Sequence, residues 1–278
     1  MPGAESDLTE WKRQLWLSAD ICNSLPYRQS RKVYLAVYAA ERTGNPHAFD
    51  HGTRDGHLLE QIIEKDLELR NRKVELSEAF PAYKRQKSYL LAGLLIDDVS
   101  NYALLSGVHA VKKDGVYHRG MEGFCAEQNM VQVPLAVLSE WERMECDHNE
   151  IWIVENPSIF ARLCGEYPCM CMNGQPRLAG LLVLDLLAEA GTVIHYAGDL
   201  DPEGLLIAQK LSQYYKGAFY YWHMTEEDYH MCRSKEALSE RRIGMLQKIT
   251  DPQLLPVARA IAEYGMAGYQ EKIDYRGR

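Results

Sequence analysis

Three carboxylates in the second half of the chain directly follow apolar segments. Glu155 comes after IWIV, and Asp199 and Asp201 come after TVIHYAG. The two aspartates are two residues apart, so in extended backbone their side chains point to roughly the same side. Negative charges gathered in this way repel one another unless a cation compensates them. Oxygen ligands with no nearby His or Cys favour Mg²⁺ or Mn²⁺, and the natural substrate of such an ion is a phosphate.

Each of these pieces also has a purely structural explanation. The run DPEG at residues 201–204 is a common helix start, with an aspartate as the cap and Pro in the first turn. Asn156 can cap another helix, which leaves Glu155 as an ordinary charge at a strand end. The joint occurrence favours the functional interpretation, because one acid ends one strand and an Asp-x-Asp pair ends another. The sequence therefore predicts one catalytic, metal-binding site formed by Glu155, Asp199 and Asp201.

Alternating strands and helices must position these acids. The pattern predicts helices at 157–164, 176–191 and 202–215, and strands at 151–154, 167–172, 192–198 and 218–224. Strands separated by single helices imply right-handed crossovers and a mostly parallel, four-stranded sheet. In such sheets ligands bind outside the carboxyl ends of the strands. The residues at these ends are Glu155, Asn156, Asn173, Gly174, Gln175, Asp199 and Asp201.

The first half of the chain has a different pattern. Apolar residues spaced by three and four predict helices at 31–41, 57–70 and 89–105. The segment TGNPHAFDHGTRDG is rich in Gly, Asn, Asp and Pro and predicts a loop. A short strand is expected at 130–133, before the charged run EWERMECDHNE. We expect a mainly helical accessory domain over residues 1–147 and an α/β domain over residues 148–278.

The composition is that of a globular protein. Of the 278 residues, 46% are hydrophobic and 25% are charged, which argues against disorder. The net charge of −8 argues against a protein that coats nucleic acid, although a metal or a local basic patch can offset phosphate repulsion in an enzyme.

The sequence offers no signal for a membrane or for secretion. The longest apolar stretch, 178–187, contains Asp185, and the polar start lacks the order of a secretory signal. A cytoplasmic protein without membrane association is therefore expected. The seven cysteines are scattered and odd in number, which predicts free thiols. Cys169 and Cys171 alternate along a strand and are expected in the core rather than at zinc.

The succession IVEN, NGQP and GDLDPEG, followed by a helix, resembles the Toprim-like domain of primases, topoisomerases and topoisomerase VI A-type proteins. The resemblance is closest to the JetD nuclease subunit of Wadjet plasmid-defence systems. Further stretches resemble that subgroup, namely LAVYAAERTGNPHAFD, SNYALLSGVHA, RRIGMLQKI and GMAGYQEKID. The resemblance therefore covers most of the chain.

The resemblance implies DNA cleavage aided by Mg²⁺ or Mn²⁺ within an anti-plasmid or anti-phage complex. The implied partners are an SMC-like ATPase, a kleisin-like subunit and a small helical subunit. Glu155, Asp199 and Asp201 match the acidic metal-binding positions of the family. The loops beside them, which hold the phosphate backbone, correspond to Asn156, Gly174 and Gln175. The catalytic tyrosine of topoisomerase VI A-type proteins has no match that we can place, so direct hydrolysis is expected.

Other functions stay open at this point. A non-catalytic subunit could keep the same fold to dock DNA or an ATPase partner, and a small-molecule phosphohydrolase could use the same acidic chemistry. A homodimer is plausible, because a nuclease that makes double-strand breaks needs two active sites. Arg241 and Arg242 could contact DNA phosphates, although a solvated helix face is the more common explanation for such a pair.

Overall fold

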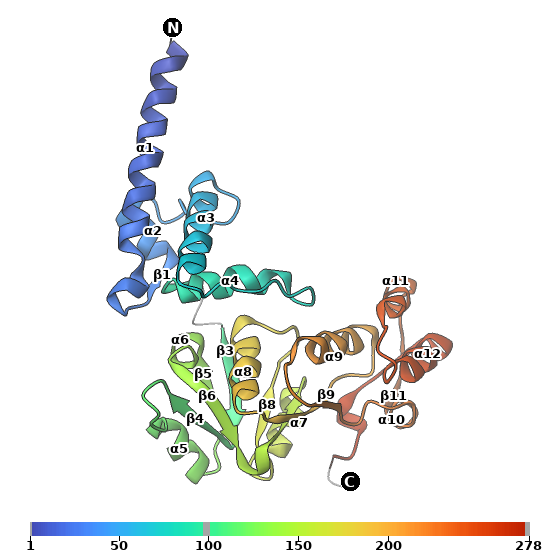
Figure 1. The fold of residues 1–278 in the computed structure, drawn as a ribbon. Coiled ribbons are helices and arrows are strands. Elements are labelled where there is room, and N and C mark those ends of the chain that lie inside the picture. Colours follow the sequence, from blue (N-terminus) through green and yellow to red (C-terminus); the bar gives the residue numbers. More distant parts are fainter. Residues whose placement is uncertain (1, 97–100, 276–278) are drawn as a thin grey trace. The chain divides into compact units, whose positions relative to one another are not determined.

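The computed structural model describes residues 2–96 and 101–275 and divides into two compact units, Met1–Ser100 and Asn101–Arg278 (Figure 1). Each unit has its own core. The predicted division at residue 147 differs from this one, because strands on both sides of residue 147 belong to the same sheet of the second unit.

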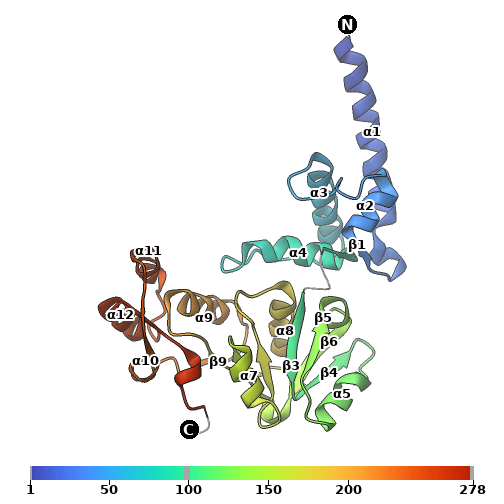
Figure 2. The same ribbon diagram turned by 180° about the vertical axis from the view of Figure 1, so that it is seen from behind.

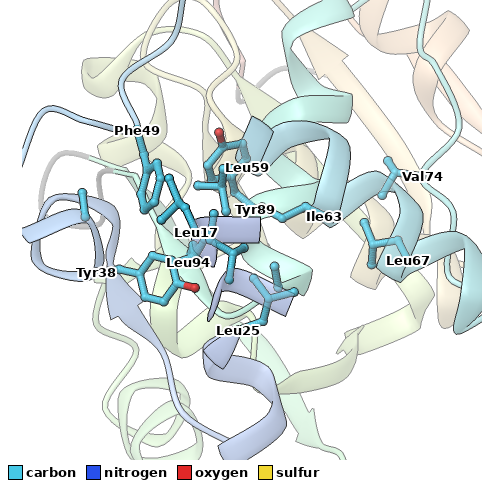
Figure 3. Packing of buried hydrophobic residues seen from close by; sticks show 13 residues of the cluster. Leu17, Leu25, Tyr38, Phe49, Leu59, Ile63, Leu67, Val74, Tyr89 and Leu94 are labelled. Atoms are coloured by element: carbon cyan, nitrogen blue, oxygen red, sulfur yellow. The ribbon is translucent and has the colours of Figure 1, made fainter. Parts of the chain in front are cut away.

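The first unit is mainly helical, as predicted. Its elements are α1 (Pro2–Ser24), η1 (Pro26–Gln29), β1 (Val33–Tyr34), α2 (Leu35–Thr43), α3 (Arg54–Leu69), α4 (Pro81–Leu91) and β2 (Leu94–Leu95). Helices α2 and α3 correspond to two of the predicted helices, and the expected loop lies between them. Apolar side chains from α1, α2 and α3, among them Leu17, Tyr38 and Ile63, form one buried cluster (Figure 3).

The helix expected at 89–105 is wrong for most of its length. Helix α4 ends at Leu91, and Gly93 follows in the left-handed region at φ +84°. A side chain at Gly93 would place a Cβ atom 2.6 Å from the backbone nitrogen of Tyr27, so the chain turns where only glycine fits. Residues 97–100 lie outside the described residues, and residues 102–106 form a strand.

The second unit is α/β and contains a six-stranded sheet with the order β10-β9-β7-β8-β3-β5. The four predicted strands are confirmed as β7 (Glu150–Val154), β8 (Cys169–Cys171), β9 (Val193–Ala197) and β10 (Phe219–Tyr221), and they are parallel. Two antiparallel strands, β3 (Tyr102–Ser106) and β5 (Val131–Pro134), extend the sheet beyond β8. The sheet is therefore larger than the four strands predicted.

The remaining elements of the second unit complete its layers. They are β4 (Val108–Lys112), α5 (Arg119–Ala126), α6 (Leu135–Leu138), β6 (Trp141–Cys146), η2 (Asp147–Asn149), α7 (Pro157–Leu163), α8 (Leu178–Glu189), α9 (Pro202–Tyr214), α10 (Glu226–Cys232), β11 (Arg233–Ala237), α11 (Glu240–Met245), η3 (Leu246–Lys248), α12 (Leu255–Tyr264), β12 (Met266–Gly268) and η4 (Gln270–Lys272). Cys169 and Cys171 are buried in β8, as expected. The helices of the described residues are too short or too polar to cross a membrane.

The strand order places a switch point between β7 and β9. The chain passes from β7 to β8 in one direction along the sheet and then returns past β7 to reach β9 and β10. Right-handed crossovers put α7 on one face and α8 and α9 on the other, and Figures 1 and 2 show the sheet from its two sides. The loops that follow β7 and β9 therefore lead to opposite faces of the sheet, and in sheets of this kind ligands bind at the carboxyl ends of the two strands beside the switch point.

Candidate active site

Glu155 is the first residue beyond β7, beside the switch point. Its backbone N–H donates to the Ala197 carbonyl (3.2 Å), which continues the pairing of β7 with β9. Gly198 leaves room for the glutamate, because a Cβ there would lie 3.2 Å from Glu155 Oε2. Oε2 is buried and has no hydrogen-bond partner among the described residues. Burial, and then the charges of Asp199 and Asp201, raise the pKa of Glu155 to about 7.

Asp199 lies two residues beyond β9. Its Oδ1 accepts a hydrogen bond from the Gln270 N–H at 3.0 Å. Burial, together with the smaller effects of the charges of Asp201 and Glu271, raises the pKa of Asp199 to about 6 despite the lowering effect of this hydrogen bond. Glu155 and Asp199 are thus two half-buried carboxyl groups that interact, in agreement with the electrostatic argument from the sequence.

Asp201 has a clear structural role. It is the N-cap of α9, and its Oδ1 accepts a hydrogen bond from the Gly204 N–H at 2.7 Å. Its Oδ2 accepts a hydrogen bond from Arg242 Nη2 at 2.6 Å. The absence of a side chain at Gly204 is required here, because a Cβ would lie 2.2 Å from the Asp199 carbonyl oxygen. The capping explanation is therefore confirmed for Asp201, and it does not exclude a second role.

Arg242, on α11, connects Asp201 with Glu203. Its Nε lies 3.0 and 2.9 Å from the two carboxylate oxygens of Glu203, and its Nη2 lies 2.7 Å from Glu203 Oε2. The same Nη2 reaches Asp201. Arg242 is thus a positive charge at the edge of the acidic site.

The C-terminal segment encloses the acids from another side. Leu200 and Gly268 exchange two backbone hydrogen bonds of 2.9 Å, which bring η4 beside the loop after β9. The side-chain oxygen of Gln270 accepts a hydrogen bond from the Asn156 N–H (3.2 Å), and Asn156 Nδ2 donates to Glu271 Oε1 at 2.6 Å. Gln270 is fully buried. This segment therefore couples the loop after β7 to the loop after β9.

The structure brings only some of the predicted residues together. Glu155, Asp199, Asp201 and Asn156 are linked by the electrostatic effects and hydrogen bonds described above. Gly174 and Gln175 follow β8 at the same edge of the sheet. Among the described residues, no hydrogen bond connects them to the acids. Within those residues, no group of three or more His, Cys, Asp or Glu side chains already has the arrangement of a metal centre.

Three residues that sequence reasoning did not place in the site are Arg242, Gln270 and Glu271. Gln270 lies 71 positions from Asp199, so no local pattern connects them. The stretches containing these residues, RRIGMLQKI and GMAGYQEKID, resemble the same family as the acidic motifs, and Arg242 also belongs to the arginine pair considered above for DNA phosphates.

The residues at this edge of the sheet fit a hard divalent cation. Glu155 offers a buried oxygen that has no partner among the described residues, and Asp199 offers a carboxylate that burial disfavours as a free anion. A bound cation would neutralise the buried charges and would also provide the oxygen of Glu155 with a partner. The donors are oxygen atoms, which Mg²⁺ and Mn²⁺ prefer.

The fold and this edge define an α/β protein with acidic side chains at the switch point of a mostly parallel sheet. The chain belongs to the family described as "Protein of unknown function C-terminus (DUF2399)", whose model matches residues 131–274, more than half of the chain. The model described as "Protein of unknown function N-terminus (DUF3323)" matches residues 7–110. No curated protein matches the chain.

Proposed function

We propose that this protein is a Mg²⁺- or Mn²⁺-dependent DNA endonuclease with a Toprim-like catalytic domain, acting as a JetD-like subunit of an anti-plasmid or anti-phage complex. The observation that carries the proposal is the position of Glu155 and Asp199 on either side of the switch point, both with raised pKa values. The motif resemblance adds DNA as the substrate, and an SMC-like ATPase with a kleisin-like subunit as partners.

In this proposal the chain's own carboxylates hold the ion. Glu155 contributes its unpartnered oxygen, and Asp199 and Asp201 contribute from the other strand end. A bound ion of this kind activates a water molecule and stabilises the negative charge that develops on the phosphate. Gly174 and Gln175, at the end of β8, are proposed to contact the DNA backbone together with Asn156.

Calorimetric titration with Mn²⁺ tests the metal site without substrate or partners. The variant should be Asp199→Asn plus Asp201→Asn, because an asparagine at 201 can still accept the capping hydrogen bond from Gly204. We expect binding to the unchanged protein and its loss in the double variant. The same variant should then abolish DNA cleavage by the assembled complex, and undiminished cleavage would exclude these acids as catalytic residues.

The contacts of Arg242 favour a second candidate, a non-catalytic subunit that docks DNA or an ATPase partner. Both oxygens of Asp201 have protein partners, so this acid already has a structural function. This alternative requires that neither the unchanged protein nor the Asp199→Asn plus Asp201→Asn variant binds Mn²⁺. It also requires that the double substitution leaves plasmid defence unaffected.

A further inference from the structure

Arg242 already pairs with Asp201, one of the acids of the candidate site. Its Nη2 lies 2.6 Å from Asp201 Oδ2 and 2.7 Å from Glu203 Oε2. We propose that Arg242 is a built-in counter-ion of the acidic site, which competes with the divalent cation for Asp201 and must release this residue before metal binds. The inference rests on the metal site of the proposed function and adds a means of holding that site inactive.

The competition follows from the hydrogen bonds of Asp201. Its Oδ1 accepts the capping hydrogen bond of α9 and its Oδ2 accepts from Arg242, so a divalent cation would have to share either oxygen with a protein donor. The side chain of Asp201 is 13% exposed and that of Arg242 is 26% exposed, so water screens this pair only in part. A guanidinium stays charged at all working pH values, so it repels a second cation at the same oxygen.

Glu203 makes the release of Asp201 a local event. It contacts Arg242 through both carboxylate oxygens, so the arginine can keep this partner when it gives up Asp201. Only one short hydrogen bond then has to break. Helix α11, which carries Arg242, packs against α9, which carries Glu203, so both residues stay close to the acidic site during the exchange.

Mn²⁺ titration of Arg242→Gln tests the competition. Without DNA, this variant should bind Mn²⁺ about tenfold more tightly than the unchanged protein, as expected for removal of one competing charge. Arg241→Gln is the matched control, because it removes the same charge from the exposed neighbour on α11. The control should leave the affinity within about twofold, since exposed charges are strongly screened. Arg242→Lys, which cannot form the planar fork, should give a smaller increase.

Each result separates this inference from the metal site itself. Equal or weaker Mn²⁺ binding by Arg242→Gln, with normal binding by the unchanged protein, would overturn the competition and leave the metal site intact. Absence of binding by both proteins would overturn the inference and the proposed function together. If Arg242→Gln does not fold, as judged by circular dichroism, Arg242→Lys decides: an affinity equal to that of the unchanged protein would contradict the competition.

Discussion

Glu155 is the residue whose chemistry differs most from that of an ordinary surface carboxylate. Burial, followed by the charges of Asp199 and Asp201, raises its pKa from 4.5 to about 7. A carboxyl group with a raised pKa holds its proton more tightly in the folded state than in the unfolded chain. Its stabilising contribution is therefore complete below about pH 4.5 and is lost as the pH rises through 7.

Replacing Glu155 with glutamine should stabilise the metal-free protein at alkaline pH. At pH 8 the buried charge is removed, and the free energy of unfolding should rise by about 1–2 kcal/mol after allowance for solvent screening. At pH 4, below the pKa of the unfolded chain, the change should be close to zero. Urea denaturation at both pH values measures the free energy of unfolding. The control is Glu166→Gln, because Glu166 is exposed in a loop. A gain that is equal at the two pH values would contradict the raised pKa.

At the scale of elements, the candidate site depends on the packing of β12 against the loop after β9. Gly268 is required at this crossing, because a Cβ there would lie 2.7 Å from Cys232 Sγ and 3.1 Å from Leu200 Cβ. Leu200 and Gly268 bond to each other through the backbone, and this pairing positions Gln270 beside Asp199.

Gly268→Ala should therefore weaken both the fold and the site. We expect a loss of about 1–3 kcal/mol in the free energy of unfolding, as for other overpacked positions, and weaker Mn²⁺ binding. Gly244→Ala is the matched control, because a Cβ at Gly244 meets no atom within 4 Å and alanine favours the helix α11. Thermal unfolding and Mn²⁺ titration measure the two effects. Similar behaviour of the two variants would show that β12 is not tightly packed against this loop.

The sequence predicted the parallel strands well because each has a local signature. An apolar run, a turn residue and a helix start recur between Ile151 and Trp222, and right-handed crossovers then determine the arrangement. Strand β3 was mistaken for part of a helix, because its pairing with β5 and β8 depends on distant residues and the effect of Gly93 depends on Tyr27. The acids can be singled out from the sequence because they follow strands, whereas Arg242 and Gln270 come to lie beside them only through tertiary folding.

At the scale of the whole molecule, the net negative charge bears on the proposed binding of DNA. With a net charge of −8, the protein is expected to repel DNA unless cations intervene. In the proposed function, part of this repulsion comes from the same carboxylates that hold the metal.

The affinity for DNA should therefore depend on metal, and this dependence should require Asp199 and Asp201. In a chelator, the Asp199→Asn plus Asp201→Asn variant should bind duplex DNA at least as well as the unchanged protein, because two negative charges are lost. Addition of Mn²⁺ should increase the affinity of the unchanged protein about tenfold and have little effect on the variant. Fluorescence anisotropy with a labelled duplex measures both. An equal increase for the two proteins would point to metal bound elsewhere.

The return of the chain past β7 has a consequence for protein synthesis. β9 pairs with β7 only after β8 and α8 have been made. Two crossover connections are therefore synthesised between Glu155 and Asp199. The contacts of Gln270 and Glu271 come later still, since Gln270 lies 71 positions after Asp199. A growing chain on the ribosome thus carries no assembled acidic site until residues 270 and 271 have been made. In the proposed function, DNA cleavage therefore starts only after the segment that carries Gln270 has folded beside the two strands.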